Sequence, residues 1–147
     1  MRKYYNDYQA IAIVKGGRNA RYVYGQVTFT QTPSGVLIIA DIHGLPQTGN
    51  GFFGFHIHEG SSCTGEGFVD SGSHFNPGGA AHPKHAGDLP PLMLCGTFAY
   101  SQVLTDRFKL ADVIGRTVII HDRPDDFTTQ PAGNAGTKIA CGVIEAR

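Results

Sequence analysis

Charged residues are scarce in this 147-residue sequence, and neither sign is in excess. Only 16% of the residues are charged, with twelve lysine and arginine side chains against twelve aspartate and glutamate side chains. So low a charge content argues against a disordered chain and against a long solvated helix. The balance of signs also gives no support to non-specific binding of nucleic acid or of an anionic membrane, because both require a basic surface.

Long apolar segments are missing as well. The sequence contains no run of eighteen apolar residues, so we expect no membrane-spanning helix. Residues 1–7 contain no apolar stretch of the kind found in a secretory signal. A mature protein whose leader has been removed would look similar. We therefore expect a cytoplasmic protein if the chain is complete, and a periplasmic or extracellular one if a leader was removed.

Glycine and proline are abundant, at 20 and 8 residues, and this is typical of short strands joined by tight turns. Alternation of apolar and polar residues marks seven candidate strands, whereas no segment of helical length shows a 3.6-residue apolar pattern. The candidate strands are residues 10–14, 23–30, 36–42, 54–59, 96–104, 117–122 and 138–145. Since there is no internal repeat or linker, we predict one all-β domain over residues 1–147, an antiparallel sandwich or closed barrel.

Two long segments, residues 60–93 and 123–136, interrupt this series of strands. Long loops in a compact β domain are usually functional. Six of the seven histidines fall between His56 and His121, and most of them lie in or beside these loops. The loops are therefore the candidate functional regions.

His56 and His58 stand two positions apart in a predicted strand. Successive strand side chains point to opposite faces, so both imidazoles project from one face, within reach of one metal ion, while Ile57 points into the core. Taken alone, the pair is explained at least as well by a polar outer face of the strand.

A second group of potential ligands lies in the first long loop. His82, His85 and Asp88 recur at intervals of three among turn-forming residues, and His74 lies eight residues upstream. Three imidazoles and one carboxylate make a closed set of the kind that zinc prefers. The alternative is a solvent-exposed turn that happens to be rich in histidine. His121 lies at the end of a predicted strand, and by itself it does not indicate a metal site.

The combination of motifs is more specific than its parts. The motifs occur in the order G-F-H-x-H, a cysteine in a glycine-rich loop, H-F-N-P, H-x-x-H-x-G-D, G-R-x-x-x-x-H and G-N-A-G-x-x-x-A-C-G. In this the sequence resembles the copper/zinc superoxide dismutases, from about Ile11 to Ile144. The resemblance implies a Greek-key antiparallel β-barrel or Ig-like sandwich of about eight strands with two long functional loops.

The resemblance also implies two metal sites. The implied copper ligands are His56, His58, His74 and His121, and the implied zinc ligands are His74, His82, His85 and Asp88. His74 would be shared, with both ring nitrogens deprotonated, which two divalent cations make possible. Asp125 would join the free ring N–H groups of His56 and His82 and so orient both ligands. Asp126 is an alternative for that role.

The family pattern joins Cys63 and Cys141 in a disulfide, whereas the alternative is three buried reduced thiols, as in a reducing cytoplasm. Cys95 has no partner in the family pattern, and we expect it to pack as a small hydrophobic residue.

The implied reaction is the dismutation of superoxide. Copper changes oxidation state, zinc fixes the loop, and His74 releases copper and carries a proton. Lys138 stands where the family usually has an arginine; an ammonium attracts the anion but lacks the planar fork that orients it, so we expect an active enzyme of reduced efficiency. The loop up to Gly133 is short and poor in lysine, and Phe53 replaces a histidine of many relatives, with an expected loss of structural hydrogen bonding.

Two further classes of function compete with this hypothesis. One is a protein of the same fold that binds or buffers metal with little or no dismutase activity. The other is an Ig-like interaction module, which would leave seven potential ligands unexplained. For partners we expect the superoxide anion, no nucleic acid and no membrane. We expect a monomer or a homodimer. The charged C-terminal residues Glu145 and Arg147 argue against the dimer of the eukaryotic enzymes, so the mode of any dimer stays open.

Overall fold

The computed structural model describes residues 8–47 and 49–147, so the prediction that residues 1–7 carry no secretory signal lies outside the described residues. The strands are β1 (Gln9–Gly16), β2 (Tyr24–Thr32), β3 (Gly35–His43), β4 (Phe52–Phe53), β5 (Phe55–His58), β6 (Leu92–Met93), β7 (Phe98–Thr105), β8 (Thr117–His121) and β9 (Lys138–Ala146). The helical turns are η1 (Arg18–Ala20), η2 (Glu66–Ser71) and α1 (Leu110–Val113). None of the helices in this part of the chain has the length and the apolar side chains needed to cross a bilayer.

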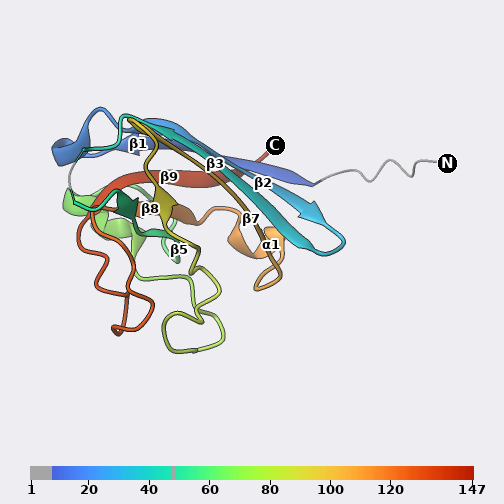
Figure 1. Ribbon diagram of the computed structural model, residues 1–147. Helices are drawn as coiled ribbons and strands as arrows, with labels where there is room; N and C mark the ends of the chain where they lie inside the picture. Colours follow the sequence, from blue (N-terminus) through green and yellow to red (C-terminus); the bar gives the residue numbers. More distant parts are fainter. Residues whose placement is uncertain (1–7, 48) are drawn as a thin grey trace.

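The described strands form a strongly curved antiparallel sheet in the order β5-β8-β9-β1-β2-β3-β7, with β4 and β6 paired separately (Figure 1). The prediction of an all-β antiparallel fold is confirmed, and all seven expected strands are present with shifts of a few residues at their ends. Sequence periodicity missed β4 and β6, because a strand of two residues shows no alternation.

The core lies on the concave face of the sheet, where alternate residues of each strand are buried. In β3, for example, Val36, Ile38, Ala40 and Ile42 point inward while the residues between them are partly exposed. Burying one such valine or isoleucine side chain contributes about 1.5–3 kcal/mol to the free energy of unfolding. Strands β5 and β8 differ from this pattern, because every residue in them is buried on both faces.

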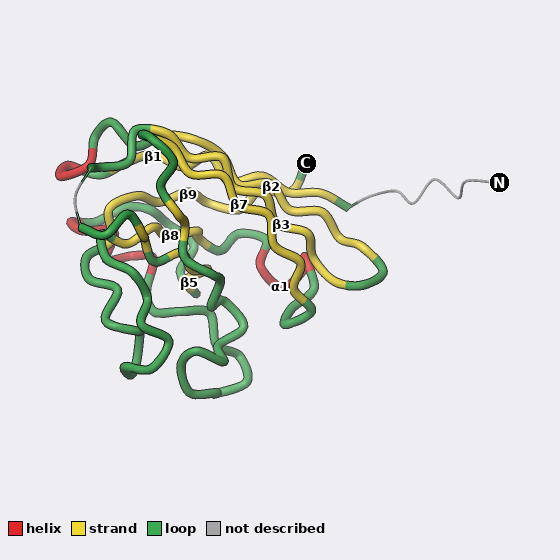
Figure 2. The backbone as a smooth tube through the Cα atoms, in the orientation of Figure 1, coloured by secondary structure: helices red, strands yellow, loops and turns green. Residues whose placement is uncertain are grey.

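Two long loops cover the second face of β5 and β8. The first loop comprises residues 59–91 and the second loop residues 122–137, close to the predicted bounds. Both loops lie on the same side of the sheet, below β5 and β8 in the view of Figures 1 and 2. Their packing explains why a strand that carries two histidines is buried.

A disulfide joins the first loop to the last strand. Cys63 and Cys141 are bonded, with their Cα atoms 5.7 Å apart. The predicted disulfide is therefore confirmed, and the alternative of three reduced thiols is wrong. The expectation for Cys95 is wrong, because this free thiol is exposed. Cys95 closes the tight turn before β7, where its N–H donates to the Phe98 carbonyl at 2.7 Å, and a side chain at such a turn has no core to enter.

Candidate metal centre

Backbone pairing places the first three histidines. His56 and His58 lie on β5, which pairs with β8, and His121 ends β8 at a point where the register shifts. Isolated antiparallel bridges join His56 to Asp88 and His58 to His74, so the first loop runs against β5. The relative exposure of His56 is 0% and that of His58 is 2%, which excludes a polar outer face as the explanation for this pair.

The structure brings the predicted ligand residues together in two clusters. The copper-type cluster is His56, His58, His74 and His121, and the zinc-type cluster is His74, His82, His85 and Asp88. Within each cluster, one ligand atom from every residue lies within 4.8 Å of the others, and every residue is buried. His74 belongs to both clusters, so its ring lies between them.

Hydrogen bonds orient the rings of the copper-type cluster. His58 donates from Nδ1 to the Gly72 carbonyl at 2.8 Å, and His121 donates from Nδ1 to the Gly136 carbonyl at 3.3 Å. These acceptors assign the protons to Nδ1, so each Nε2 carries a lone pair. The two Nε2 atoms face each other at 3.3 Å. Two lone pairs at this distance repel unless a cation lies near both.

Three further nitrogens in the described residues support a cation. His56 Nδ1, His74 Nε2 and His82 Nδ1 are buried and have no hydrogen-bond partner. His82 Nδ1 lies 3.0 Å from Asp88 Oδ2, but without the geometry of a hydrogen bond. A buried polar atom without a partner costs about 1–3 kcal/mol. Metal ions at the two clusters would satisfy all three atoms, so the residues present fit one divalent ion in each cluster.

Burial favours the neutral form of three histidines in the copper-type cluster. It lowers the pKa of His58 to about 2 and that of His121 to about 3, and it lowers the pKa of His56 as well. These three imidazoles therefore each hold a lone pair at neutral pH, and a metal does not have to displace a proton from it. A set of four imidazoles suits copper, which has the highest affinity of the first-row divalent ions for such sites.

Asp88 brings a negative charge to the zinc-type cluster. Its Oδ1 lies 2.8 Å from His74 Nδ1 and its Oδ2 lies 3.3 Å from His85 Nδ1. Burial raises the pKa of Asp88, but the hydrogen bond from His74 and the neighbouring imidazoles outweigh it, and the net pKa is lowered. Three imidazoles and one carboxylate fit the closed ligand set that is typical of a structural zinc site.

Asp125 links the two clusters from the second loop. Its Oδ2 accepts from His56 Nε2 at 2.7 Å, and its Oδ1 accepts from His82 Nε2 at 2.8 Å and from the Phe127 N–H at 2.7 Å. Burial raises the pKa of Asp125, but these hydrogen bonds outweigh it, and the net pKa is lowered. Asp126 lies outside this link, because its carboxylate caps the turn at Thr128 and Thr129.

Lys138 lies at the edge of the copper-type cluster. A cavity of about 390 Å³ is lined by His58, His74, His121 and Lys138 among others. The Lys138 ammonium donates to Ser71 Oγ at 2.8 Å, to the Gly72 carbonyl at 2.8 Å and to the Phe68 carbonyl at 3.4 Å. Burial lowers its pKa. The Gly72 carbonyl therefore receives hydrogen bonds from both Lys138 and His58.

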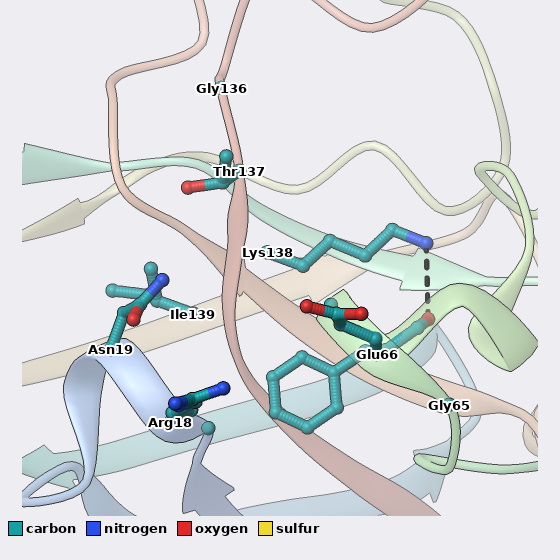
Figure 3. A pocket seen from close by; sticks show the side chains of 11 residues that line it. Arg18, Asn19, Gly65, Glu66, Gly136, Thr137, Lys138 and Ile139 are labelled. Carbon is teal, nitrogen blue, oxygen red and sulfur yellow. Dashed lines mark hydrogen bonds between the residues drawn. The ribbon is translucent and has the colours of Figure 1, made fainter.

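The stem of Lys138 also borders a larger surface cavity of about 780 Å³ between η1, η2 and the start of β9 (Figure 3). Arg18 and Glu66 line this cavity, whereas the clustered histidines do not. Of the two cavities that Lys138 lines, the smaller one therefore reaches the potential metal ligands.

One residue near the clusters was expected to matter, and another was not foreseen. Phe53, for which we expected a loss of structural hydrogen bonding, is fully buried and pairs with Leu92 between β4 and β6, so a phenyl ring fills this place. Arg107 was missed. Its Nη1 donates to the carbonyls of Pro83 at 2.9 Å and of His85 at 3.1 Å, and so ties the first loop to the β7–α1 connection. No local sequence pattern marks such a bond.

Comparison with known proteins agrees with this geometry. The family model described as copper/zinc superoxide dismutase matches residues 23–144. A Cu-Zn superoxide dismutase of Legionella pneumophila is 40% identical over 129 residues, covering 82% of this chain and 77% of the relative. The Cu-Zn superoxide dismutase 2 of Aquifex aeolicus is 39% identical over 137 residues, covering 83% and 79%. An extracellular Cu-Zn superoxide dismutase of Drosophila melanogaster is 39% identical over 157 residues, covering 92% and 84%.

Proposed function

Because this chain belongs to the copper/zinc superoxide dismutase family, we propose that its two adjoining clusters form the centre at which superoxide is dismutated. In this reaction two superoxide anions and two protons give one dioxygen and one hydrogen peroxide. The copper ligands would be His56, His58, His74 and His121, and the zinc ligands His74, His82, His85 and Asp88. When bound, copper would supply one-electron redox chemistry, and zinc would supply a fixed divalent charge.

His74 carries the proposal, because it is the one described residue that belongs to both clusters. Its Nδ1 lies 2.8 Å from Asp88, while its Nε2 is buried without a hydrogen-bond partner. A basic nitrogen of this kind holds a proton in one half of the reaction and gives it up in the other. We therefore place one of the two transferred protons at His74 Nε2.

Lys138 would attract the anion. Its ammonium borders the cavity that reaches His58, His74 and His121, and a positive charge in a cleft raises the local concentration of a small anion. All three of its contacts go to Phe68, Ser71 and Gly72, so it contributes charge at a fixed position.

The competing hypothesis is a metal-buffering protein of the same fold, and a superoxide assay separates the two. The protein is loaded with one copper and one zinc per chain, and the decay of superoxide is followed. We expect catalysis by the parent and its loss in His58→Ala. The matched control is His43→Ala, because His43 is the histidine of this sequence that lies outside both clusters. Binding of both metals without catalysis would favour the buffering protein.

The remaining parts of the proposal concern the setting of this centre. We propose that residues 1–147 fold as one domain, supported by a single cluster of core residues in the described part of the chain. The Cys63–Cys141 disulfide and the extracellular relative support an oxidising compartment, the second of the two locations predicted. For assembly, the exposed Glu145 and Arg147 support either a monomer or a homodimer that leaves the end of β9 free, and sedimentation would distinguish these states.

A further inference from the structure

Gln130, in the second loop, pairs with the main chain of His82 in the first loop. The His82 N–H donates to Gln130 Oε1 at 2.9 Å, and Gln130 Nε2 donates to the His82 carbonyl at 2.7 Å. One side-chain amide thus satisfies both main-chain groups of a potential zinc ligand, in the manner of a neighbouring strand. Gln130 stands 48 positions away in the sequence, so the two bonds also join the loops.

The same loop holds the His82 ring. Asp125 Oδ1 accepts from His82 Nε2 at 2.8 Å, five positions before Gln130. The loop approaches so closely that a Cβ atom at Gly133 would lie 2.7 Å from His82 Nε2, and Gly133 has a φ of +68°. His82 is therefore fixed at two points, at the ring by Asp125 and at the backbone by Gln130.

Fixing both points determines the direction of the remaining ring nitrogen. His82 Nδ1 is the buried atom without a hydrogen-bond partner, and it faces the carboxylate of Asp88 at 3.0 Å. If the backbone of His82 moved, the ring could keep its bond to Asp125 only by turning Nδ1 away from the zinc-type cluster. Gln130 itself is exposed, so it has no packing role that would explain its fixed position.

We propose that Gln130 is a positioning residue of the zinc site, which holds the main chain of His82 so that Nδ1 stays directed at the metal. This inference rests on the proposed function, since it requires zinc at the second cluster. Partners that orient a metal ligand typically change metal affinity by 10- to 100-fold when they are removed. Removing the two hydrogen bonds of Gln130 keeps all four ligand residues and takes away only what holds His82 in position. We therefore expect a change in zinc affinity at the lower end of this range.

The test is Gln130→Met, which keeps the length of the side chain and removes both hydrogen-bonding groups. Its matched control is Gln47→Met, because Gln47 also bonds a backbone group through its amide, donating to the Gly96 carbonyl at 2.7 Å, but in a loop that contributes no residue to either cluster. Zinc affinity is measured by competition with a chelator, and Co(II) is used as a spectroscopic probe of the same site. The melting temperature of each metal-free protein is measured in parallel.

We expect zinc binding about tenfold weaker in Gln130→Met and unchanged in Gln47→Met. The Co(II) absorption of Gln130→Met should be altered, and the melting temperatures of the two metal-free variants should be equally close to that of the parent. Zinc affinity within twofold of the parent would overturn the inference. So would a melting temperature in metal-free Gln130→Met far below that of Gln47→Met, because the role of Gln130 would then be general stability. Failure of the parent to bind zinc would instead overturn the proposed function.

Discussion

Asp125 Oδ2 lies 2.7 Å from His56 Nε2, and this contact leaves His56 Nδ1 as the ring nitrogen that faces the copper-type cluster. The other oxygen of Asp125 does the same for His82 in the zinc-type cluster. One carboxylate therefore orients a potential ligand in each cluster. The affinities for copper and zinc should depend on it together.

Asp125→Asn tests this dependence. An amide can accept a hydrogen bond with one atom only, so one of the two imidazoles would face an N–H donor and turn. We expect the affinity for copper, zinc or both to fall about 10- to 100-fold, measured by chelator competition. Asp41→Asn is the control, because Asp41 Oδ1 lies 2.9 Å from His43 Nε2 on the surface, outside both clusters. Equal metal affinities in Asp125→Asn and the parent would show that Asp125 does not orient the metal ligands.

Substitutions of Lys138 test the role of positive charge beside the cavity. Lys138→Gln should lower kcat/KM by about tenfold, because it removes the charge that attracts the anion. Lys138→Arg should raise kcat/KM, because a guanidinium presents a planar fork that orients an anion. The rates are measured at several ionic strengths, since screening weakens attraction. An unchanged rate in Lys138→Arg would refute the orienting advantage of arginine.

The disulfide should contribute strongly to stability. Cys63 and Cys141 are separated by 78 positions, and the chain-entropy relation for a loop of this length gives about 4 to 5 kcal/mol. We expect Cys141→Ser to lower the free energy of unfolding in urea by an amount of this order. Cys95→Ser is the control, because that free thiol is exposed and should leave the stability unchanged. A small effect of Cys141→Ser would mean that the first loop is held by other contacts.

The metal-free protein should lose stability as the pH falls below about 6.5. Burial lowers the pKa of His58 to about 2 and of His121 to about 3 in the folded state, whereas both take up protons near pH 6.5 when unfolded. Between pH 6 and pH 4 the unfolded chain binds more protons, so the free energy of unfolding falls by about 1.4 kcal/mol per pH unit for each histidine. Above pH 6.5 this contribution is fully present.

Urea denaturation in the presence of a chelator, at several pH values from 4.5 to 7.5, measures this slope. His58→Asn removes one of the histidines whose pKa burial lowers, so it should flatten the slope. A stability independent of pH over this range would contradict the burial of neutral imidazoles.

Strand positions were predictable because a half-buried strand alternates along the sequence. The alternation in 36–42 matches the buried Val36, Ile38, Ala40 and Ile42 of β3. It also put His56 and His58 on one face, but it did not reveal that loops cover this face. The identities of the metals came from the order of the motifs, not from periodicity.

Contacts between distant main-chain and side-chain groups could not be predicted. The bonds of Gln130 to His82 and of Arg107 to Pro83 join segments 48 and 24 positions apart, and neither leaves a local pattern. The exposure of Cys95 was mispredicted for a related reason. A thiol favours burial in general, but the turn at Cys95 and Phe98 determines its position.

The sharing of His74 by two metal ions is tested most directly by a crystal structure of the copper- and zinc-loaded protein. Anomalous scattering at the absorption edge of each metal locates the two ions separately. We expect one copper on the Nε2 side of His74 and one zinc on its Nδ1 side. A single metal site, or two ions of which either lies away from the His74 ring, would contradict it.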